Sequence, residues 1–213
     1  GFNRLAVVDL DERSDQPMYD ETERYLILFN GEIYNHKHLK KLLCQSYGIT
    51  FKTSSDTEVL LEGLIKEGSK FINKLDGIFA FIFIDLSNLN IIMGRDPFGV
   101  KRLYYIHKKD QLIVSSELKP FNWEKKKKIK EKAIVEFMSF GTVFDNDTYF
   151  DDVKELSSNS FVEFSLNEEN PKNFKIKKYK KLNNDNDNKN DADPETITYL
   201  VKETIKKQTP EIP

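Results

Sequence analysis

The chain has 213 residues, of which 38% are hydrophobic and 12% aromatic, so it can bury the core of one large domain. Its formal net charge is −2 with 32% charged residues of both signs, which argues against nucleic acid or a membrane surface as a partner. No apolar run reaches the length of a membrane span, and no signal peptide is recognisable. The single cysteine, Cys44, cannot form an internal disulfide, which suits a reducing compartment. We therefore expect a cytoplasmic protein.

The first predicted elements are strands followed by a helix. Residues 1–9 begin almost inside an apolar strand, and because native termini are usually polar, we expect further residues upstream of Gly1. The run 25–29 is rich in aromatic and β-branched residues and predicts a buried strand. A helix is predicted from about His36 to Tyr47, with Gly48 as its C-terminal stop. Its apolar face comprises Leu39, Leu42, Leu43 and Tyr47.

Between this strand and this helix lies the motif Asn30-Gly31-Glu32-Ile33-Tyr34-Asn35. A glycine at such a position lets backbone approach a ligand closely. The Asn30 amide and the adjacent Gly31 N–H form a donor pair that can hold an oxyanion. The alternative is an ordinary turn, with Asn35 as the N-cap of the helix.

A second helix is predicted to begin near Ser55. Ser55 as N-cap and Glu58 three residues later fit a capping box. Asp56 would lie in the first turn, where an acidic residue is stabilised by the helix dipole. That position is a sufficient structural reason for the carboxylate. Four apolar residues form the stripe of this helix: Leu60, Leu61, Leu64 and Ile65.

Several strands follow. Residues 77–85 are apolar throughout, as in a strand covered on both faces, and residues 90–93 return as a hairpin. A second hairpin is predicted from 103–106 and 111–115. Strands buried on both faces and flanked by amphipathic helices predict an α+β fold in which two stacked antiparallel sheets lie between helical layers.

The remaining elements are less continuous. A helix is predicted over about 131–139, with Ile134, Phe137 and Met138 on one side, and a strand over 161–166. Residues 180–193 are rich in Asn, Asp and Lys and predict a mobile linker. A last helix starts at Asp193-Pro194. Its apolar stripe comprises Ile197, Leu200, Val201 and Ile205.

The ordered set of motifs resembles the glutaminase domain of glutamine-hydrolysing asparagine synthetases, a class II glutamine amidotransferase of the N-terminal-nucleophile (Ntn) hydrolase kind. The motifs that carry this resemblance are Arg4–Asp9, Asn30–Asn35, Ser55–Glu58, Leu75–Ala80, Arg95–Lys101 with Leu103-Tyr104-Tyr105, and Ser116-Glu117. The resemblance implies a four-layer αββα sandwich. It also implies three parts: a glutaminase domain over 1–166, a connecting strand and linker over 167–193, and the start of a synthetase domain over 194–213.

The resemblance also implies roles for individual residues. Asn30 and Gly31 would form the oxyanion hole, and the backbone of Val7 and Val8 would line the pocket. Arg4 would bind the α-carboxylate of glutamine, for which a guanidinium fork is well suited.

The α-ammonium of glutamine would be held by Asp56 with help from Glu32. Two carboxylates beside one ammonium are a reasonable clamp, because the ligand charge relieves their mutual repulsion. We interpret Arg95, Asp96 and Glu117 as a structural network near the pocket rather than as reacting groups.

The nucleophile of the family is an N-terminal cysteine, which this sequence lacks because it starts at Gly1. Cys44 cannot replace it, since a buried cysteine within a helix is usually inert. The ATP-pyrophosphatase loop of the family would follow Pro213. Arg102 stands where the family usually has proline, a change that a surface loop tolerates.

These observations predict the glutaminase part of an asparagine synthetase, which hydrolyses glutamine and supplies ammonia for amidation of aspartate. The segment itself needs no cofactor, whereas ATP and Mg²⁺ are expected in the synthetase domain. The expected partners are glutamine, that domain and a second copy in a homodimer. Two alternatives remain: a same-fold amidotransferase acting on another carboxylate such as a sugar acid, or a non-catalytic glutamine-binding module. As given, the chain is expected to be inactive alone.

Overall fold

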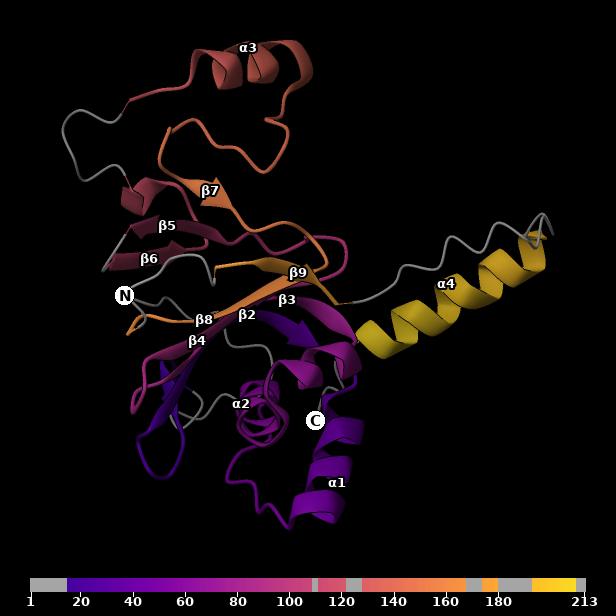
Figure 1. Ribbon diagram of the computed structural model, residues 1–213. Helices are drawn as coiled ribbons and strands as arrows, with labels where there is room; N and C mark the ends of the chain where they lie inside the picture. Colours follow the sequence, from indigo (N-terminus) through magenta and orange to yellow (C-terminus); the bar gives the residue numbers. More distant parts are fainter. Residues whose placement is uncertain (1–14, 109–110, 122–127, 168–173, 180–192, 210–213) are drawn as a thin grey trace.

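The computed structural model describes residues 15–108, 111–121, 128–167, 174–179 and 193–209. Their elements are β1 (Met18–Tyr19), β2 (Tyr25–Ile33), α1 (His36–Tyr47), α2 (Asp56–Glu67), η2 (Gly68–Lys74), β3 (Gly77–Asp85), β4 (Asn90–Arg95), β5 (Tyr104–Lys108), β6 (Gln111–Ser115), η3 (Lys119–Phe121), α3 (Glu131–Phe140), β7 (Lys154–Glu155), β8 (Ser160–Ser165), β9 (Ile176–Lys178) and α4 (Pro194–Gln208). Figure 1 shows their arrangement.

The larger of two sheets has six strands in the order β1-β2-β3-β4-β8-β9, all antiparallel. Its longest ladder joins β2 to β3 and runs from the pair Tyr25–Asp85 to the pair Ile33–Gly77. The predicted strand 77–85 is confirmed, and its continuous apolar character follows from burial on both faces.

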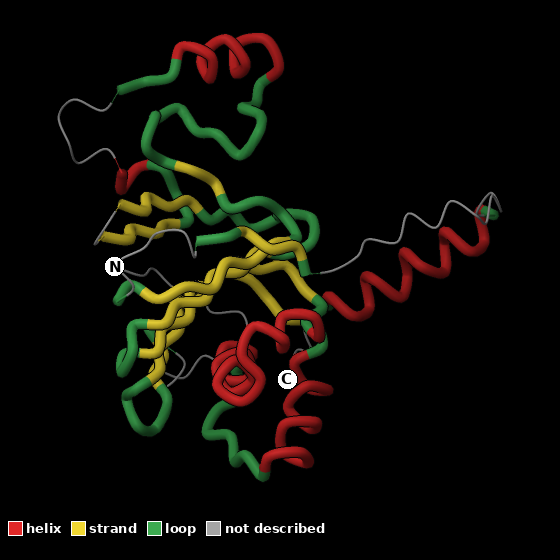
Figure 2. Tube along the Cα trace, in the orientation of Figure 1, coloured by secondary structure: helices red, strands yellow, loops and turns green. Residues whose placement is uncertain are grey.

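Helices α1 and α2 cover one face of this sheet (Figures 1 and 2). The core between helices and sheet includes Leu39 and Leu43 of α1, with Leu60, Leu61 and Leu64 of α2. The predicted stripe of α1 is narrower than expected, because Leu42 is 38% and Tyr47 46% exposed.

The opposite face of the large sheet packs on a three-stranded antiparallel sheet, β6-β5-β7. Ala80, Met93 and Val162 from the large sheet meet Leu103, Tyr105 and Leu156 in the core between the sheets. The outer face of the small sheet is covered by η3 and the loop before β7, through Phe121, Phe150 and Val153. Helix α3 lies beyond this layer (Figure 1). The predicted stack of two antiparallel sheets with helices outside is confirmed.

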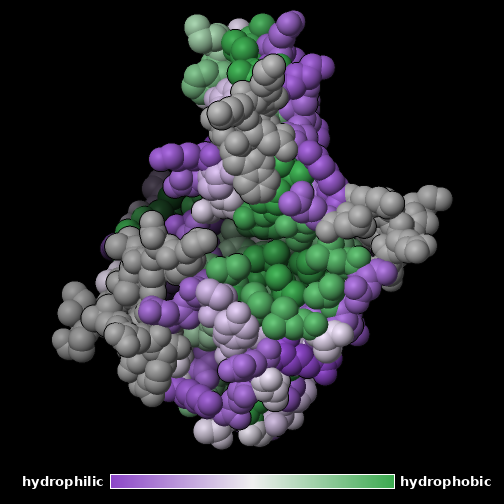
Figure 3. All heavy atoms as spheres, turned by 90° about the vertical axis from the view of Figure 1, so that its left-hand side faces the viewer, coloured by the Kyte–Doolittle hydropathy of each residue, from purple (hydrophilic) through white to green (hydrophobic). Residues whose placement is uncertain are grey.

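The two last helices expose their apolar faces. On α3 the apolar side was predicted to comprise Ile134, Phe137 and Met138. Each of these residues is at least 46% exposed, and Ala133 is the buried residue of the helix. These side chains contribute to the apolar area at the top of Figure 3. Helix α4 begins as predicted, with the Asp193 carboxylate accepting from the Thr196 N–H at 2.7 Å. Its apolar stripe is at least half exposed. The predicted linker lies almost wholly outside the described residues.

Among the described helices, none is both long enough and apolar enough to cross a membrane.

Candidate functional site

The motif Asn30–Asn35 does not follow the strand, as we expected, but completes it. Strand β2 runs to Ile33, because the start of β3 pairs with it as far as Gly77. Side chains alternate along a strand. Asn30 and Glu32 therefore lie on the same face as Leu28, which packs in the core between the two sheets.

Gly31 is held against the backbone of β3. Its φ is +151°, and a Cβ here would lie 2.1 Å from the carbonyl oxygen of Ile78 and 2.7 Å from the Cα of Phe79. The close approach that we predicted for this glycine is present, and the neighbour is a strand of the same chain. Residues Asn30–Ile33 of the motif are thus part of the β2–β3 ladder, where their backbone has little freedom.

The N–H of Gly31 points to the edge of β2 that faces away from β3. Its partner on β3 is Phe79, whose two backbone groups both bond to Asp96 on the β4 side. The Phe79 N–H donates to the Asp96 carboxylate, and the Phe79 carbonyl accepts from the Asp96 N–H. Backbone groups that face a given edge alternate along an antiparallel strand, so those of Gly31 face away from β3. On that edge β1 pairs only with Leu26 and Ile27, and within the described chain nothing accepts from Gly31.

The Asn30 amide is available beside this N–H. Asn30 is exposed and lies opposite Ala80, and its side chain makes no hydrogen bond to any described residue. The strand thus carries a side-chain amide and a backbone N–H on adjacent residues, the pair of donors that an oxyanion hole requires.

Asp56 reaches the same end of β2 from the first turn of α2. It is 6% exposed, and its Oδ2 accepts from the N–H of Ile33 at 3.0 Å. Burial raises the pKa of Asp56, and the Ile33 hydrogen bond and the nearby His36 offset this rise in part. Asp56 therefore does more than cap its helix: it joins the helix start to the strand that carries the motif.

Glu32 completes a pair of carboxylates with Asp56. Burial is the main cause that raises the pKa of Glu32, and the negative charge of Asp56 raises it further, against the opposing effects of His36 and Lys101. An α-ammonium placed between the two carboxylates would relieve both the burial cost and the repulsion. The structure thus brings Asn30, Gly31, Glu32 and Asp56 together.

The predicted capping box on α2 is half right. Ser55 is the N-cap and accepts from the Thr57 N–H at 3.2 Å. Glu58 does not reach back to Ser55. It accepts from the N–H and the hydroxyl of Thr53 at 2.8 and 2.6 Å, because the preceding loop folds over the helix start.

Asn35 occupies the N-cap position of α1 but does not cap it with its side chain. Its amide donates to the Lys74 carbonyl at 2.8 Å and accepts from the Asp76 N–H at 3.0 Å. Asn35 therefore ties the corner between β2 and α1 to the segment that enters β3. The predicted N-cap position of Asn35 is confirmed, but its side chain does not cap the helix because it is hydrogen-bonded to the Lys74–Asp76 segment.

Arg95 and Asp96 form a buried structural network. Asp96 accepts from the backbone N–H groups of Phe98, Val100 and Lys101 at 3.0–3.1 Å. Arg95 donates to the carbonyls of Lys101 and Gly99, both at 2.7 Å. The side chains of Arg95 and Asp96 thus fix the shape of the loop 96–101. Lys101 of this loop lies near enough to Glu32 to lower its pKa. Glu117 was expected in the same network, but it is exposed and lies at the end of β6.

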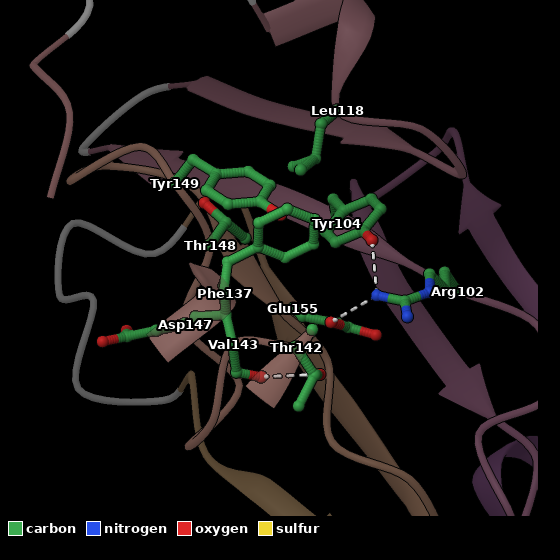
Figure 4. A pocket seen from close by; sticks show the side chains of 11 residues that line it. Arg102, Tyr104, Leu118, Phe137, Thr142, Val143, Asp147, Thr148, Tyr149 and Glu155 are labelled. Atoms are coloured by element: carbon green, nitrogen blue, oxygen red, sulfur yellow. Dashed lines mark hydrogen bonds and ion pairs between the residues drawn. The ribbon is translucent and has the colours of Figure 1, made fainter. Parts of the chain in front are cut away.

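Arg102 is anchored on the surface rather than free. Its guanidinium donates to the Tyr104 hydroxyl at 2.9 Å and lies 3.4 Å from Glu155, which also pairs with Arg95 (Figure 4). These residues border a cleft of about 120 Å³ between the small sheet and the segment after α3. None of the four clustered motif residues lines this cleft, and it is a separate feature.

Three of the predicted glutamine-binding residues, Arg4, Val7 and Val8, lie outside the described residues. Cys44 is exposed on α1, not buried as we expected. It follows His36 by eight residues, or about 12 Å along the helix, which still separates it from the motif.

Sequence reasoning missed two residues beside the site, Gln16 and His36. His36 comes directly after the motif, and its Nδ1 lies 2.8 Å from the Ile33 carbonyl. The side chain of Gln16 bonds both backbone groups of Phe29. Adjacency to the motif could have indicated His36, whereas Gln16 is brought to β2 only by the pairing of β1.

Comparison with known proteins shows the family to which the chain belongs. Residues 1–179 match the family model described as a glutamine amidotransferase domain. The chain is 38% identical over 161 residues to the glutamine-hydrolyzing asparagine synthetase 1 of Bacillus subtilis (strain 168), covering 75% of this chain and 25% of that protein. It is 42% identical over 120 residues to the glutamine-hydrolyzing asparagine synthetase of Sandersonia aurantiaca, covering 56% and 22%. The chain thus spans about a quarter of the length of these relatives.

A solved structure shares the fold. The glutamine phosphoribosylpyrophosphate amidotransferase from B. subtilis, complexed with ADP and GMP, superposes with a TM-score of 0.51 at 21% identity, covering 80% of this chain and 33% of that one. Taken with the match over residues 1–179, the chain belongs to the glutamine amidotransferase domain family.

Proposed function

We propose that the chain is the glutaminase part of an asparagine synthetase that hydrolyses glutamine to glutamate and ammonia. One observation carries the proposal: the exposed Asn30 amide and the Gly31 N–H belong to adjacent residues near the end of β2, where the carboxylates of Glu32 and Asp56 also lie. Two donors for an oxyanion and two acceptors for an ammonium match the two ends of glutamine. Identity of 38–42% to asparagine synthetases supports the same assignment.

In the proposed reaction, a thiolate attacks the side-chain carboxamide carbon of glutamine. The resulting tetrahedral oxyanion accepts from Asn30 and Gly31. The proton that the thiol lost on becoming a thiolate is transferred to the amide nitrogen, the carbon–nitrogen bond breaks, and ammonia leaves a thioester behind. Water then hydrolyses the thioester to glutamate. Asp56 and Glu32 hold the α-ammonium and Arg4 the α-carboxylate throughout. The N-terminal cysteine that the resemblance implies would supply the thiolate.

The rest of the proposed enzyme uses the ammonia. It would bind ATP, Mg²⁺ and aspartate and form a β-aspartyl-adenylate that ammonia attacks. In this proposal residues 1–166 are the glutaminase domain, 167–193 connect, and 194–213 begin the synthetase domain. We further propose a cytoplasmic homodimer, consistent with the single cysteine.

The test follows nitrogen through the complete protein. Glutamine labelled with ¹⁵N in its side-chain amide, supplied with aspartate and ATP, is expected to yield asparagine labelled in its amide. Labelled ammonia without asparagine would assign the protein to amidotransferases with another acceptor, such as a sugar acid. Glutamine binding without hydrolysis would contradict the catalytic proposal and favour a binding module.

Replacing Asp56 by asparagine should separate binding from stability. The pKa of Asp56 is raised in the fold, so the stability linked to its protonation is complete below the unfolded pKa and is lost as pH rises through the folded value. Asparagine keeps an oxygen for the Ile33 N–H. We therefore expect an unchanged or higher Tm at pH 7, an advantage that disappears near pH 4. The KM for glutamine should rise roughly 10- to 100-fold, because a charged partner of the ammonium is lost.

Asp85 provides a matched control with the opposite sign. It pairs with Arg24 at 2.7 and 2.9 Å at the far end of β3, and this hydrogen bonding is the main cause that lowers the pKa of Asp85. Its stabilising effect is present at neutral pH and lost as pH falls. Asp85→Asn should therefore lower Tm at pH 7 and leave the KM for glutamine unchanged. Equal losses of Tm in both variants would show that Asp56 is structural.

A further inference from the structure

Along the edge of β2 that faces away from β3, the backbone groups of the residues on either side of Gly31 are hydrogen-bonded to side chains. Every second residue of the strand directs its backbone N–H and C=O to this edge, and here these residues are Phe29, Gly31 and Ile33. Strand β1 begins at Met18, opposite Ile27, so it does not pair with any of the three. An unpaired strand edge offers free N–H and C=O groups to water or to other chains.

At Phe29 the partner is the Gln16 amide. Its Nε2 donates to the Phe29 carbonyl at 2.9 Å, and its Oε1 accepts from the Phe29 N–H at 2.5 Å. A carboxamide has one donor and one acceptor in a plane, so it can imitate a paired strand. The Gln16 side chain thus takes the place of a strand backbone opposite Phe29, two residues beyond the last β1 pair.

At Ile33 two different side chains bond the two backbone groups. Asp56 accepts from the N–H at 3.0 Å, and the Nδ1 of His36 lies 2.8 Å from the carbonyl oxygen. Because a carbonyl only accepts, Nδ1 carries the proton. Both partners stand at the starts of helices, α1 and α2, so the end of β2 is fixed to two rigid elements.

We propose that Gln16 and His36 are positioning residues for glutamine hydrolysis: they hold the peptide groups on either side of Gly31, so that its N–H stays directed at the oxyanion. The proposal rests on the proposed function. We call these two side chains the edge clamp. Neither contacts the reacting atoms. Each fixes a backbone residue two positions from Gly31, and small errors in the placement of a catalytic donor reduce rate steeply.

The His36 position offers a sharp test in the complete protein. In asparagine the amide nitrogen lies where Nδ1 lies in histidine, whereas in glutamine it lies one bond farther out. His36→Leu and His36→Gln are expected to lower kcat for glutamine hydrolysis about 10- to 100-fold. His36→Asn should stay within about threefold of wild type. Since the asparagine and glutamine variants are both polar, they also guard against a failure of the leucine variant to fold.

The Gln16 position tests the other half of the clamp. Gln16→Glu has nearly the same shape and keeps an acceptor for the Phe29 N–H, but its second oxygen faces the Phe29 carbonyl. We expect a loss of kcat for Gln16→Glu comparable with that of His36→Leu. Ammonia-driven synthesis, which does not use the glutamine site, should be unchanged in all four variants.

The outcomes separate this inference from the proposed function. Wild-type protein without glutaminase activity would overturn the proposed function. Active wild type with unchanged kcat in His36→Leu, His36→Gln and Gln16→Glu would overturn the edge clamp. A His36→Asn variant as impaired as His36→Leu would do the same, because the Nδ1 hydrogen bond would then not be the feature that matters. Amide hydrogen exchange across residues 25–34 gives a reading independent of activity, and faster exchange is expected in the impaired variants.

Discussion

Asn30→Ala in the complete protein is expected to lower kcat for glutamine hydrolysis by roughly 10²–10³, with a small change in KM. The reason is that an oxyanion donor acts mainly in the transition state, where its removal costs about 2.7–4 kcal/mol. The Asn30 amide has no other partner among the described residues, so its loss removes little from the fold. Steady-state glutaminase kinetics, with Tm as a check on folding, measure the effect.

Three comparisons make the Asn30 result specific. Arg4→Ala and Asp56→Ala should act mainly on KM, because these residues are assigned to the ends of glutamine that do not react. Asn73→Ala, an exposed asparagine on η2, should leave kcat within about twofold. Ammonia-driven synthesis should survive all four changes. If Asn30→Ala keeps a normal kcat, then Asn30 is a strand residue with no part in catalysis.

Gly31→Ala is expected to destabilise the protein by about 3–5 kcal/mol, which is unusually large for one methyl group. A Cβ at this position would lie 2.1 Å from the Ile78 oxygen, at a φ of +151° that side chains rarely adopt. Both obstacles are backbone, so neither can move aside as a flexible side chain would. The β2–β3 ladder would have to separate near Phe79. Urea unfolding measures the loss through the midpoint at constant m.

Gly48→Ala is the matched control for Gly31→Ala. Gly48 also has a positive φ, +66°, but a Cβ added to it would meet no described atom within 4 Å. Only the strain of the left-handed conformation remains, which costs about 1–2 kcal/mol. Equal losses at the two glycines would mean that the approach of β3 to Gly31 has no energetic consequence.

The site combines rigid backbone with unfavourable charge. The motif lies in the longest ladder of the large sheet, whereas Glu32 and Asp56 carry pKa values raised mainly by burial. In the proposed binding mode, the charged pair makes the empty protein less stable than a neutral variant would be, and the ammonium of glutamine would offset this cost. This is the usual relation between stability and function in binding sites.

The sequence by itself determined most elements and indicated four described residues that lie close together in the structure. Apolar runs and helical periodicity located β3, α1 and α2, because burial of one or both faces leaves a direct trace in residue order. Local chemistry located Gly48 and Asp193 at helix ends. The motif order pointed to Asn30, Gly31, Glu32 and Asp56 as one site, and the structure places them together.

Only the tertiary structure decided where the hydrogen bonds of these residues go. Pairing with β3 extended β2 into the motif and turned the Gly31 N–H to the edge that faces away from β3, since register depends on residues far away in the chain. Asn35 and Glu58 have the local pattern of capping residues, yet their side chains bond elsewhere. Asn35 bonds the backbone of Lys74 and Asp76, and Glu58 accepts from Thr53. Gln16 reached β2 through the pairing of β1, which no local pattern indicated. Residue order records which faces are buried, whereas the partner of each polar group is set by contacts between distant segments.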